Sequence, residues 1–344
     1  MIDIIVGGQG GDEGKGDFVR YLADSGKYEF CIKVGAPQAG HSTYVNGVKF
    51  GLSSVPCAFT NPKVALYLAA GSYIIPFSSL PKLPKFLEEV EKTGTIDRIK
   101  VDNYCGIITE AHTIEERADA NLKGVGTVGT GAGKSLRDRV ERKEGYLFAK
   151  DIPELKHFLA DVASEIQARL EKGEHGLIEG TQGFRLSLLH SREFPDVTAR
   201  DTTASTFAGE AGIGPTQVRD VYCVFKPYFT RVARGPMINE IKDEEKLKRY
   251  WQDGGETGTV SGRKRRIGEF DWEGANLAIK INGTTKLALT HLDMLDGFDK
   301  DLEKLTGEAK EFLEKFLELE KIYPYPKLAI VKYGPLPEDI VDLR

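Results

Sequence analysis

The chain has 344 residues and a formal net charge of −5, from 47 Lys and Arg residues against 52 Asp and Glu residues. Hydrophobic residues make up 40% of the chain, which is enough for one large α/β domain with a packed core. The mildly acidic balance argues against binding of nucleic acid or an anionic membrane through bulk charge, so any phosphate site must be built locally.

The four cysteines lie far apart and form no CxxC pair or Cys/His cluster with zinc-binding spacing. They predict free buried thiols in a reducing compartment. Residues 1–6 have the pattern of a strand, with no signal-peptide-like segment before them, and no apolar run has the length of a membrane span. We therefore expect a cytoplasmic protein with no nucleic-acid partner and no membrane partner.

Short apolar strands alternate with amphipathic helices along the chain. The expected strands are 2–6, 30–34, 64–69, 99–101, 176–179, 218–225, 286–290 and 328–333. The expected helices are one that follows residue 16 and those at 83–92, 151–172 and 301–320, with a glycine-rich loop at 123–133. This alternation predicts an α/β fold, in which one domain, 1–344, holds a mostly parallel sheet flanked by helices, with loop excursions.

A glycine-rich loop, GGQGGDEGKG at 7–16, joins the first expected strand to the first helix. Its glycines let backbone N–H groups approach phosphate oxygens, Lys15 offsets their charge, and a helix N-terminus lies behind the loop. The loop is not a standard Walker A motif, because five residues rather than four separate Gly8 from Gly14. In addition, Gly16 stands where a serine or threonine would bind magnesium.

Two acidic residues inside this loop point to chemistry as well as binding. Asp12 and Glu13 would repel phosphate unless one of them binds Mg²⁺ or acts as a base. A second stretch, GTGAGKS at 129–135, looks like a Walker A motif, but Val128 occupies the first glycine position and 118–123 does not read as a buried strand. We interpret it as a mobile substrate loop.

Three further motifs follow expected strands or lie in loops. His41 follows a strand and a glycine, and a lone histidine of this kind is usually structural. Residues 290–293 (THLD) are similar to the guanine-reading motif of GTP-binding proteins, in which an aspartate accepts bonds from the guanine N1–H and amine. The basic run at 262–266 (GRKRR) is either a solvated loop or a clamp for carboxylates and phosphate.

In this order the motifs resemble those of the adenylosuccinate synthetase family. The matching segments are 11–16 (GDEGKG), 38–41 (QAGH), 179–183 (EGTQG), 197–204, 209–215, 231–236, 262–266, 292–297 and 334–335. The resemblance implies a P-loop-NTPase-like fold and a GTP-dependent ligase that joins L-aspartate to IMP through a 6-phosphoryl-IMP intermediate. That reaction is the first committed step of AMP synthesis from IMP.

The resemblance also implies roles for individual residues. Asp12 corresponds to the general base and a Mg²⁺ ligand, His41 to the general acid, and Lys15 to the neutraliser of phosphate charge, while the Gly40 carbonyl corresponds to a second Mg²⁺ ligand. The implied GTP and Mg²⁺ site comprises Gly11, Asp12, Glu13, Gly14, Lys15, Gly16, Gly40, His41, Ser42, His291, Asp293 and Gly334. The implied IMP and L-aspartate site comprises Gln38, Ala39, Thr127, Arg142, Gln182, Thr198, Val232, Thr259, Val260, Ser261, Arg263 and Arg265.

Arg142 corresponds to an arginine that reaches the neighbouring subunit's IMP phosphate site, so the resemblance implies a homodimer with shared sites. The chain departs from the family pattern at Gln38, which replaces asparagine, and at Val128, which replaces a phosphate-contacting threonine. It also departs at Arg20, where an acidic residue is usual, and at His291, which replaces lysine.

Three alternatives are a ligase of the dethiobiotin synthetase type, which phosphorylates a carboxylate, a regulatory GTP-binding switch, and a catalytically inactive relative. The Asp12/His41 pair and the basic run at 263–266 argue against the first, and the absence of a standard Walker A loop argues against the second. The retention of Asp12, Lys15 and His41 argues against the third.

Overall fold

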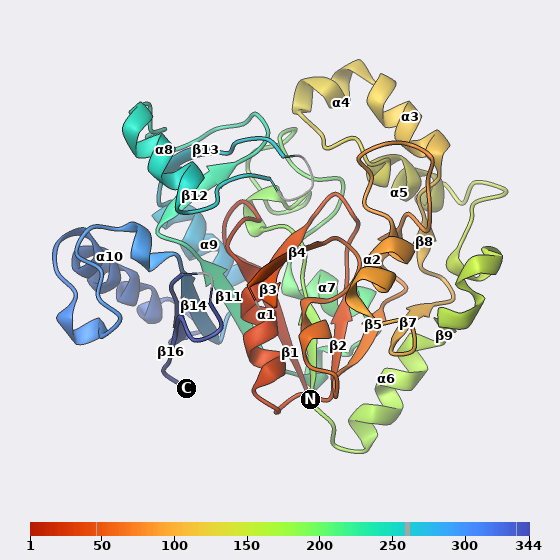
Figure 1. Ribbon diagram of the computed structural model, residues 1–344, viewed down its shortest axis with the longest axis horizontal. Coiled ribbons are helices and arrows are strands. Elements are labelled where there is room, and N and C mark those ends of the chain that lie inside the picture. The colour runs from red at the N-terminus through yellow and green to blue at the C-terminus, as the bar shows by residue number, and fades with distance from the viewer. Residues whose placement is uncertain (46, 259–261, 335) are drawn as a thin grey trace.

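A computed structural model describes residues 1–45, 47–258, 262–334 and 336–344. Its centre is a ten-stranded sheet in the order β16-β15-β14-β11-β1-β10-β2-β5-β7-β9, in which all neighbours are parallel except β15 and β16 (Figure 1). The strands are β1 Ile2–Gly7, β2 Phe30–Lys33, β5 Ala65–Leu68, β7 Ile99–Asp102, β9 Leu159–Ala160, β10 Gly176–Glu179, β11 Val218–Phe225, β14 Lys286–Thr290, β15 Lys327–Lys332 and β16 Ile340–Asp342.

Side chains of the central strands alternate between two apolar cores, one on each face of the sheet. In β1, Ile4 and Val6 belong to one core and Ile5 to the other. The strands read as continuous apolar runs because a parallel sheet is buried on both faces. Parallel strands also bring their carboxyl ends to one edge, where loops from several strands meet.

Helices cover both faces of this sheet (Figure 1). Helices α1 and α2 pack into the core that contains Ile5, while α6, α7, α9 and α10 pack into the core that contains Ile4 and Val6. The helices are α1 Lys15–Asp24, α2 Phe86–Thr93, α3 Glu110–Ala118, α4 Ala120–Val125, α5 Ala132–Val140, α6 Val162–Glu171, α7 Ala204–Glu210, α8 Glu244–Gln252, α9 Trp272–Asn282 and α10 Gly307–Leu317.

Three small two-stranded sheets lie outside the main sheet. They are β3 His41–Val45 with β4 Val48–Leu52, β12 Tyr228–Arg231 with β13 Arg266–Glu269, and β6 Tyr73–Ile74 with β8 Gly106–Ile107. In Figure 1, β12 and β13 lie with α8 on one side of the molecule, and α3, α4 and α5 lie together on the other. These two groups of excursions flank the edge of the sheet where the loops meet.

The fold class is as predicted, and each expected strand is present with a boundary shift of no more than one residue at either end. The predicted helix over 151–172 is right only in its second half, where α6 lies. A 3₁₀ turn at Pro153–Phe158 is followed by β9, which pairs with β7, and α6 begins only after Asp161 caps it through the Ser164 N–H. Proline lacks the N–H that a helix interior needs, and sheet pairing overrides the helical period of the apolar residues.

Three other boundaries also differ from the prediction. The helix expected over 83–92 is α2, which begins at Phe86, after Pro84. The loop expected over 123–133 is partly helical, because α4 extends to Val125 and α5 begins at Ala132. The helix expected over 301–320 begins at Gly307, because Asp301 accepts a bond from the Glu303 N–H, which closes a separate 3₁₀ turn, and Leu305 then enters the core. Local capping by aspartate competes with helix continuation in this segment.

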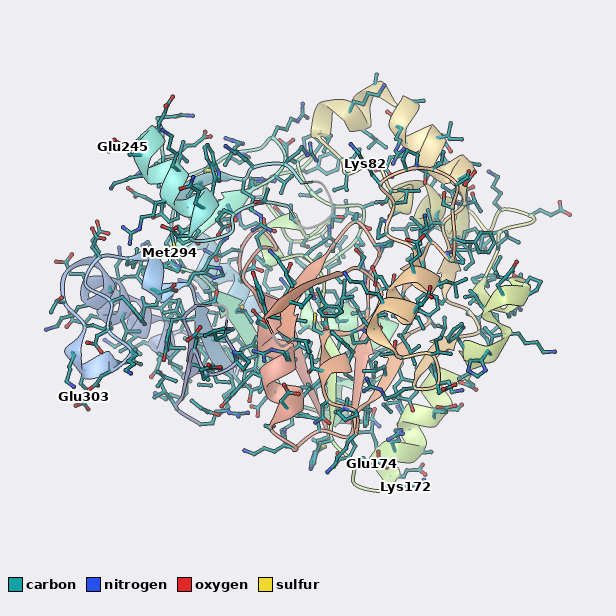
Figure 2. The ribbon with its side chains drawn as sticks, viewed as in Figure 1. Lys82, Lys172, Glu174, Glu245, Met294 and Glu303 are labelled. Carbon is teal, nitrogen blue, oxygen red and sulfur yellow. The ribbon has the colours of Figure 1, made fainter. Side chains whose placement is uncertain are left out.

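Charged side chains surround the fold, and those labelled Lys172, Glu245 and Glu303 in Figure 2 lie at its periphery. Among the described residues, no helix combines the length and the apolar character needed to cross a bilayer. All four cysteines are buried and free, as predicted.

Candidate active site

Loops from the carboxyl ends of the central strands enclose two adjoining cavities of about 230 and about 260 Å³. Four described residues line both cavities: Gly11, Asp12, Gly40 and His41. The first two come from the loop after β1, and the other two lie where the loop after β2 enters β3. A ligand in one cavity would therefore meet a ligand in the other at a carboxylate and an imidazole.

The first cavity gathers most residues that the sequence assigned to IMP and aspartate. Its described lining includes seven of them: Gln38, Ala39, Thr127, Gln182, Thr198, Val232 and Arg263. They come from loops after β2, β10 and β12 and from the excursion between α4 and α5. Thr130, Ala132 and Gly133 of the segment 129–135 line this cavity and not the second. The segment is not the free loop that the sequence predicted, because α5 begins at Ala132 and the residues before it are bonded to Glu116 of α3.

The second cavity gathers the residues assigned to the nucleotide. Its described lining includes Gly14, Lys15, Gly16, Ser42, His291, Asp293 and Gly334, besides the four shared residues. The sequence assigned Arg265 to the substrate side, but it lines this second cavity and is not among the described lining residues of the first. The N-terminus of α1 opens into the cavity, so its unpaired N–H groups and dipole favour an anion there.

An ion pair between two residues of the glycine loop stabilises its conformation. The Nζ of Lys15 lies 2.7 Å from Oε2 of Glu13, and Oε1 of Glu13 accepts bonds from the N–H groups of Gln9 and Gly11. Burial opposes ionisation of Glu13, but Lys15 and these bonds lower the pKa of its carboxyl below its ordinary value. Gly14 is left-handed (φ 77°) and caps α1, a conformation that favours glycine. Glu13 thus orders the loop.

Asp12 is held by a chain of alternating charges. Its Oδ1 lies 3.0 Å from Arg265, which lies 2.7 Å from Glu256, which in turn lies 2.6 Å from Lys226. Burial raises the pKa of Asp12 although Arg265 opposes the shift, whereas Glu256, also buried, has a pKa held at about 2 by Lys226 and Arg265. Burial thus increases the proton affinity of Asp12, as a general base requires; it also raises the pKa of Asp17, but Asp17 lines only the second cavity.

His41 is fixed by a second buried carboxylate. Its Nδ1 lies 2.5 Å from Oε1 of Glu179, whose other oxygen accepts the Cys57 N–H, and Lys33 lies 3.2 Å from the same carboxylate. Burial would raise the pKa of Glu179, but Lys33 and the bond from His41 hold it at about 2. Burial lowers the pKa of His41 to about 4. Because a carboxylate only accepts, Nδ1 carries the proton, and Nε2 has no partner among the described residues.

The far end of the second cavity combines Asp293, His291 and Lys332. Oδ1 of Asp293 is buried without a hydrogen-bond partner among the described residues, which leaves an acceptor for a ligand. Burial lowers the pKa of His291 to about 4, so its ring is neutral at neutral pH. Lys332 lines the cavity from the end of β15 and donates to the carbonyls of Gly334 and Leu336. It supplies a cation to the same cavity in which His291 stands where the family pattern has lysine.

Some predicted site residues are not brought into either cavity. Glu13 and Arg142 are not among the described lining residues: Glu13 faces Lys15, and Arg142 is exposed just after α5 with φ 55°. The predicted residues Thr259, Val260 and Ser261 lie outside the described residues.

Sequence reasoning missed several charged residues that support the site. They are Lys33, Glu116, Lys226, Glu256 and Lys332, and also Glu179, which was noted only as part of a motif. The sequence offered one signal that could have identified such residues, namely a charged residue at the end of a buried strand, as at Lys33 and Glu179. Charged groups are rarely buried unless paired, so each of them implies a partner that the sequence does not identify.

Two cavities that share a candidate base and an imidazole, beside a nucleotide-type loop, define a ligase that couples a nucleotide to a second substrate. A family model described as adenylosuccinate synthetase matches residues 4–150 and 146–302. The chain belongs to the adenylosuccinate synthetase family, and its function is the ligation of IMP and aspartate in purine biosynthesis.

Relatives agree with this assignment over nearly the whole chain. Adenylosuccinate synthetase of Methanocaldococcus jannaschii is 42% identical over 351 residues, which cover 99% of this chain and 96% of the relative. That of Pyrococcus horikoshii is also 42% identical, over 349 residues that cover 99% and 98% of the two chains.

Solved structures share the fold at lower identity. Fully ligated adenylosuccinate synthetase from Plasmodium falciparum has a TM-score of 0.81 at 22% identity, with 99% of both chains covered. The succinoaminodeoxyadenylate synthetase of cyanophage S-2L, bound to dGMP and to dATP as an energy donor, has a TM-score of 0.82 at 24% identity, with 99% of this chain and 95% of that chain covered.

Proposed function

We propose that the chain joins L-aspartate to IMP with GTP as the energy donor, through a 6-phosphoryl-IMP intermediate. The observation that carries this proposal is that Asp12 and His41 line both cavities. IMP would occupy the first cavity and GTP the second, so that the purine O6 and the γ-phosphoryl group meet at these two side chains.

In the first step Asp12 takes the N1 proton of IMP, and O6 attacks the γ-phosphorus of GTP while the bond to the β–γ bridging oxygen breaks. The increased proton affinity of Asp12 suits it to this task. Lys15 and the N-terminus of α1 offset the phosphate charge. Approach of the phosphates favours protonation of His41, whose Nε2 can then donate to the transferring group.

In the second step the amine of L-aspartate attacks C6, the C6–O bond breaks to release inorganic phosphate, and the attacking nitrogen loses one proton to the departing phosphate. Phosphate is a far better leaving group than the original oxygen, which is the chemical reason for the first step. Arg263 lines the first cavity, so its guanidinium is suited to hold a carboxylate of aspartate, whereas Arg265 lines the second cavity and pairs with Asp12 and Glu256.

The residues shared by the cavities also fit Mg²⁺. The Asp12 carboxylate and the Gly40 carbonyl are hard oxygen ligands, which this ion prefers, and both residues line the two cavities. When bound, Mg²⁺ would neutralise charge on the phosphates.

The proposal is tested by incubating the protein with IMP, L-aspartate, Mg²⁺ and either GTP or ATP, and by following phosphate release and succinyl-purine absorbance. The partnerless Oδ1 of Asp293 suits the N1–H and amine of guanine, which adenine lacks, so we expect GTP to give the higher kcat/KM. Equal use of ATP would contradict the guanine-reading role of Asp293, and no turnover with either nucleotide would contradict the proposal as a whole.

We further propose a homodimer in which Arg142 completes the IMP phosphate site of the partner subunit. Arg142→Leu should raise the KM for IMP about tenfold or more and leave the KM for GTP nearly unchanged, because a lost charge-assisted bond to phosphate costs about 1.5–3 kcal/mol. Mixing this variant with an Asp12→Ala variant should restore part of the activity, since mixed dimers contain one intact site. Absence of any recovery after confirmed subunit exchange would contradict shared sites.

A further inference from the structure

The loop at 127–131, which borders the first cavity, is fastened to α3 through one buried carboxylate. Oε1 of Glu116 accepts bonds from the Thr127 hydroxyl and the Gly129 N–H (3.2 Å), and Oε2 accepts the Gly131 N–H at 2.6 Å. Glu116 is 4% exposed. The loop thus commits two N–H groups and one hydroxyl to Glu116, so these donors are not available to a ligand.

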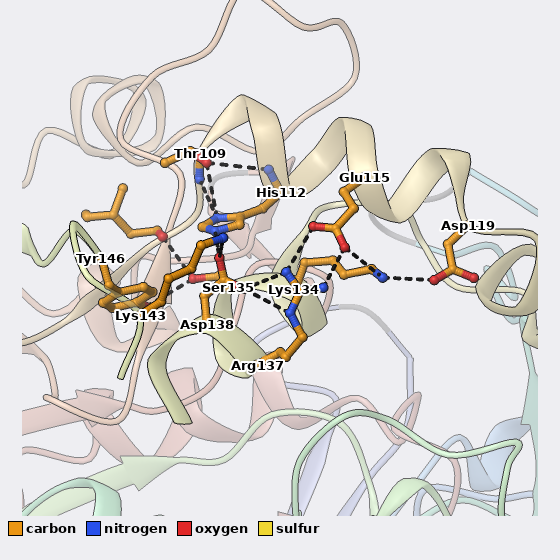
Figure 3. A network of polar contacts seen from close by, with 11 residues as sticks. Thr109, His112, Glu115, Asp119, Lys134, Ser135, Arg137, Asp138, Lys143 and Tyr146 are labelled. Carbon is orange, nitrogen blue, oxygen red and sulfur yellow. Dashed lines mark hydrogen bonds and ion pairs between the residues drawn. The ribbon is translucent and has the colours of Figure 1, made fainter. Parts of the chain in front are cut away.

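Neighbouring contacts make this attachment rigid. Arg117 donates to the Gly129 carbonyl at 3.0 Å, and Thr113 donates to the Thr130 carbonyl at 2.8 Å. On the same helices, Arg137 pairs with Glu115, Lys134 pairs with Asp119 and His112 contacts Asp138, which together hold α5 against α3 and α4 (Figure 3). The loop therefore has little freedom to exchange these bonds for contacts to a ligand.

One hydroxyl of this loop is left without a partner. Val128 has no donor in its side chain, and the Thr127 hydroxyl proton is used by Glu116. Thr130 lines the first cavity and is 1% exposed, and its Oγ1 has no hydrogen-bond partner within the described chain. Buried hydroxyl groups are usually paired, and what distinguishes Thr130 from the partnerless hydroxyl of Thr284 is that Thr130 borders a cavity, where a ligand can supply the partner.

We propose that Thr130 is a substrate-binding residue that donates its hydroxyl to an anionic oxygen of the ligand in the first cavity, and that Glu116 positions it. This inference rests on the proposed function. The anionic oxygen belongs either to the IMP phosphate or to a carboxylate of L-aspartate, and both present the same chemistry to a hydroxyl donor. Thr130 then takes the donor role for which Val128 is unsuited.

The test compares Thr130→Val, which removes the hydroxyl at nearly constant volume, with Thr130→Ser, which retains it. Thr130→Val should raise the KM for either IMP or L-aspartate about tenfold, and the substrate that responds identifies the source of the oxygen. The KM for GTP should stay within about twofold, and Thr130→Ser should recover most of the lost affinity. Thr284→Val is the matched control, because Thr284 is a fully buried threonine that is not among the described lining residues of either cavity.

The inference would be overturned if Thr130→Val kept the KM for both IMP and L-aspartate within twofold of the values of the unmodified enzyme. The hydroxyl would then contact water alone. That result differs from failure of the proposed function, in which the unmodified enzyme itself shows no turnover. Glu116→Gln tests whether Glu116 positions Thr130, and it should raise the KM for the same substrate. In the double variant with Thr130→Val, the fold-increase in KM should be smaller than the product of the two single-variant increases. Independent effects would contradict the positioning role of Glu116.

Discussion

Asp12→Asn should lower kcat about 10²–10⁴-fold while GTP binding and folding persist. The amide has the shape of the carboxylate but cannot accept the N1 proton of IMP, and a positioned general base contributes a factor of this size. Steady-state phosphate release measures the rate, and calorimetric titration measures GTP binding. A rate within about threefold of that of the unmodified enzyme would remove Asp12 as the base.

The free energy of unfolding of Asp12→Asn gives a control, because the direction of its change at pH 7 can be predicted. Burial raises the pKa of Asp12, so the folded protein binds this proton more tightly than the unfolded chain does. Above the pKa of Asp12 in the folded protein, the ionised carboxylate therefore reduces the free energy of unfolding. This destabilisation disappears as the pH falls and the carboxylate takes up its proton. Asp12→Asn should be at least as stable as the unmodified protein at pH 7, and its kcat/KM should lack the acid limb that protonation of Asp12 produces.

The sequence was sufficient for those parts of the fold and site that depend on local pattern. Apolar runs located the strands because a parallel sheet buries both faces, and the glycine loop was located because backbone contact with phosphate requires glycines after a strand. The strand-to-loop order then placed Asp12, His41 and Asp293 at one edge of the sheet, where the two cavities lie.

Those features of the fold and site that depend on residues distant in the sequence could not be predicted. The period of 151–172 is helical, but β7 offers an edge that converts Leu159 and Ala160 into a strand. Similarly, the pairing of His41 with Glu179 joins residues 138 positions apart in the sequence. Pairs at such a separation leave no local signature, which is why the supporting charges of the site were missed and its loop residues were not.

Glu179→Gln should lower the free energy of unfolding by about 3–5 kcal/mol at pH 7, because it leaves the buried Lys33 ammonium without its counter-charge. The pKa of Glu179 is held at about 2, below that of the unfolded chain, so this carboxylate stabilises the fold above the ordinary value of 4.5 and less so as the pH falls toward 2. Denaturant titrations at pH 7 and at pH 4 should show the larger difference at pH 7.

The same substitution should lower kcat about 10²-fold by a separate route. The carboxylate accepts the Nδ1 proton of His41 at 2.5 Å and so leaves Nε2 directed to the cavities, whereas an amide can present either an acceptor or a donor to Nδ1. The double variant Lys33→Met, Glu179→Gln separates the two effects, because it removes the unpaired ammonium without restoring the carboxylate. Its stability should recover by several kcal/mol while kcat stays low. Joint recovery of stability and kcat would mean that Glu179 serves the fold alone and that the orientation of His41 has another origin.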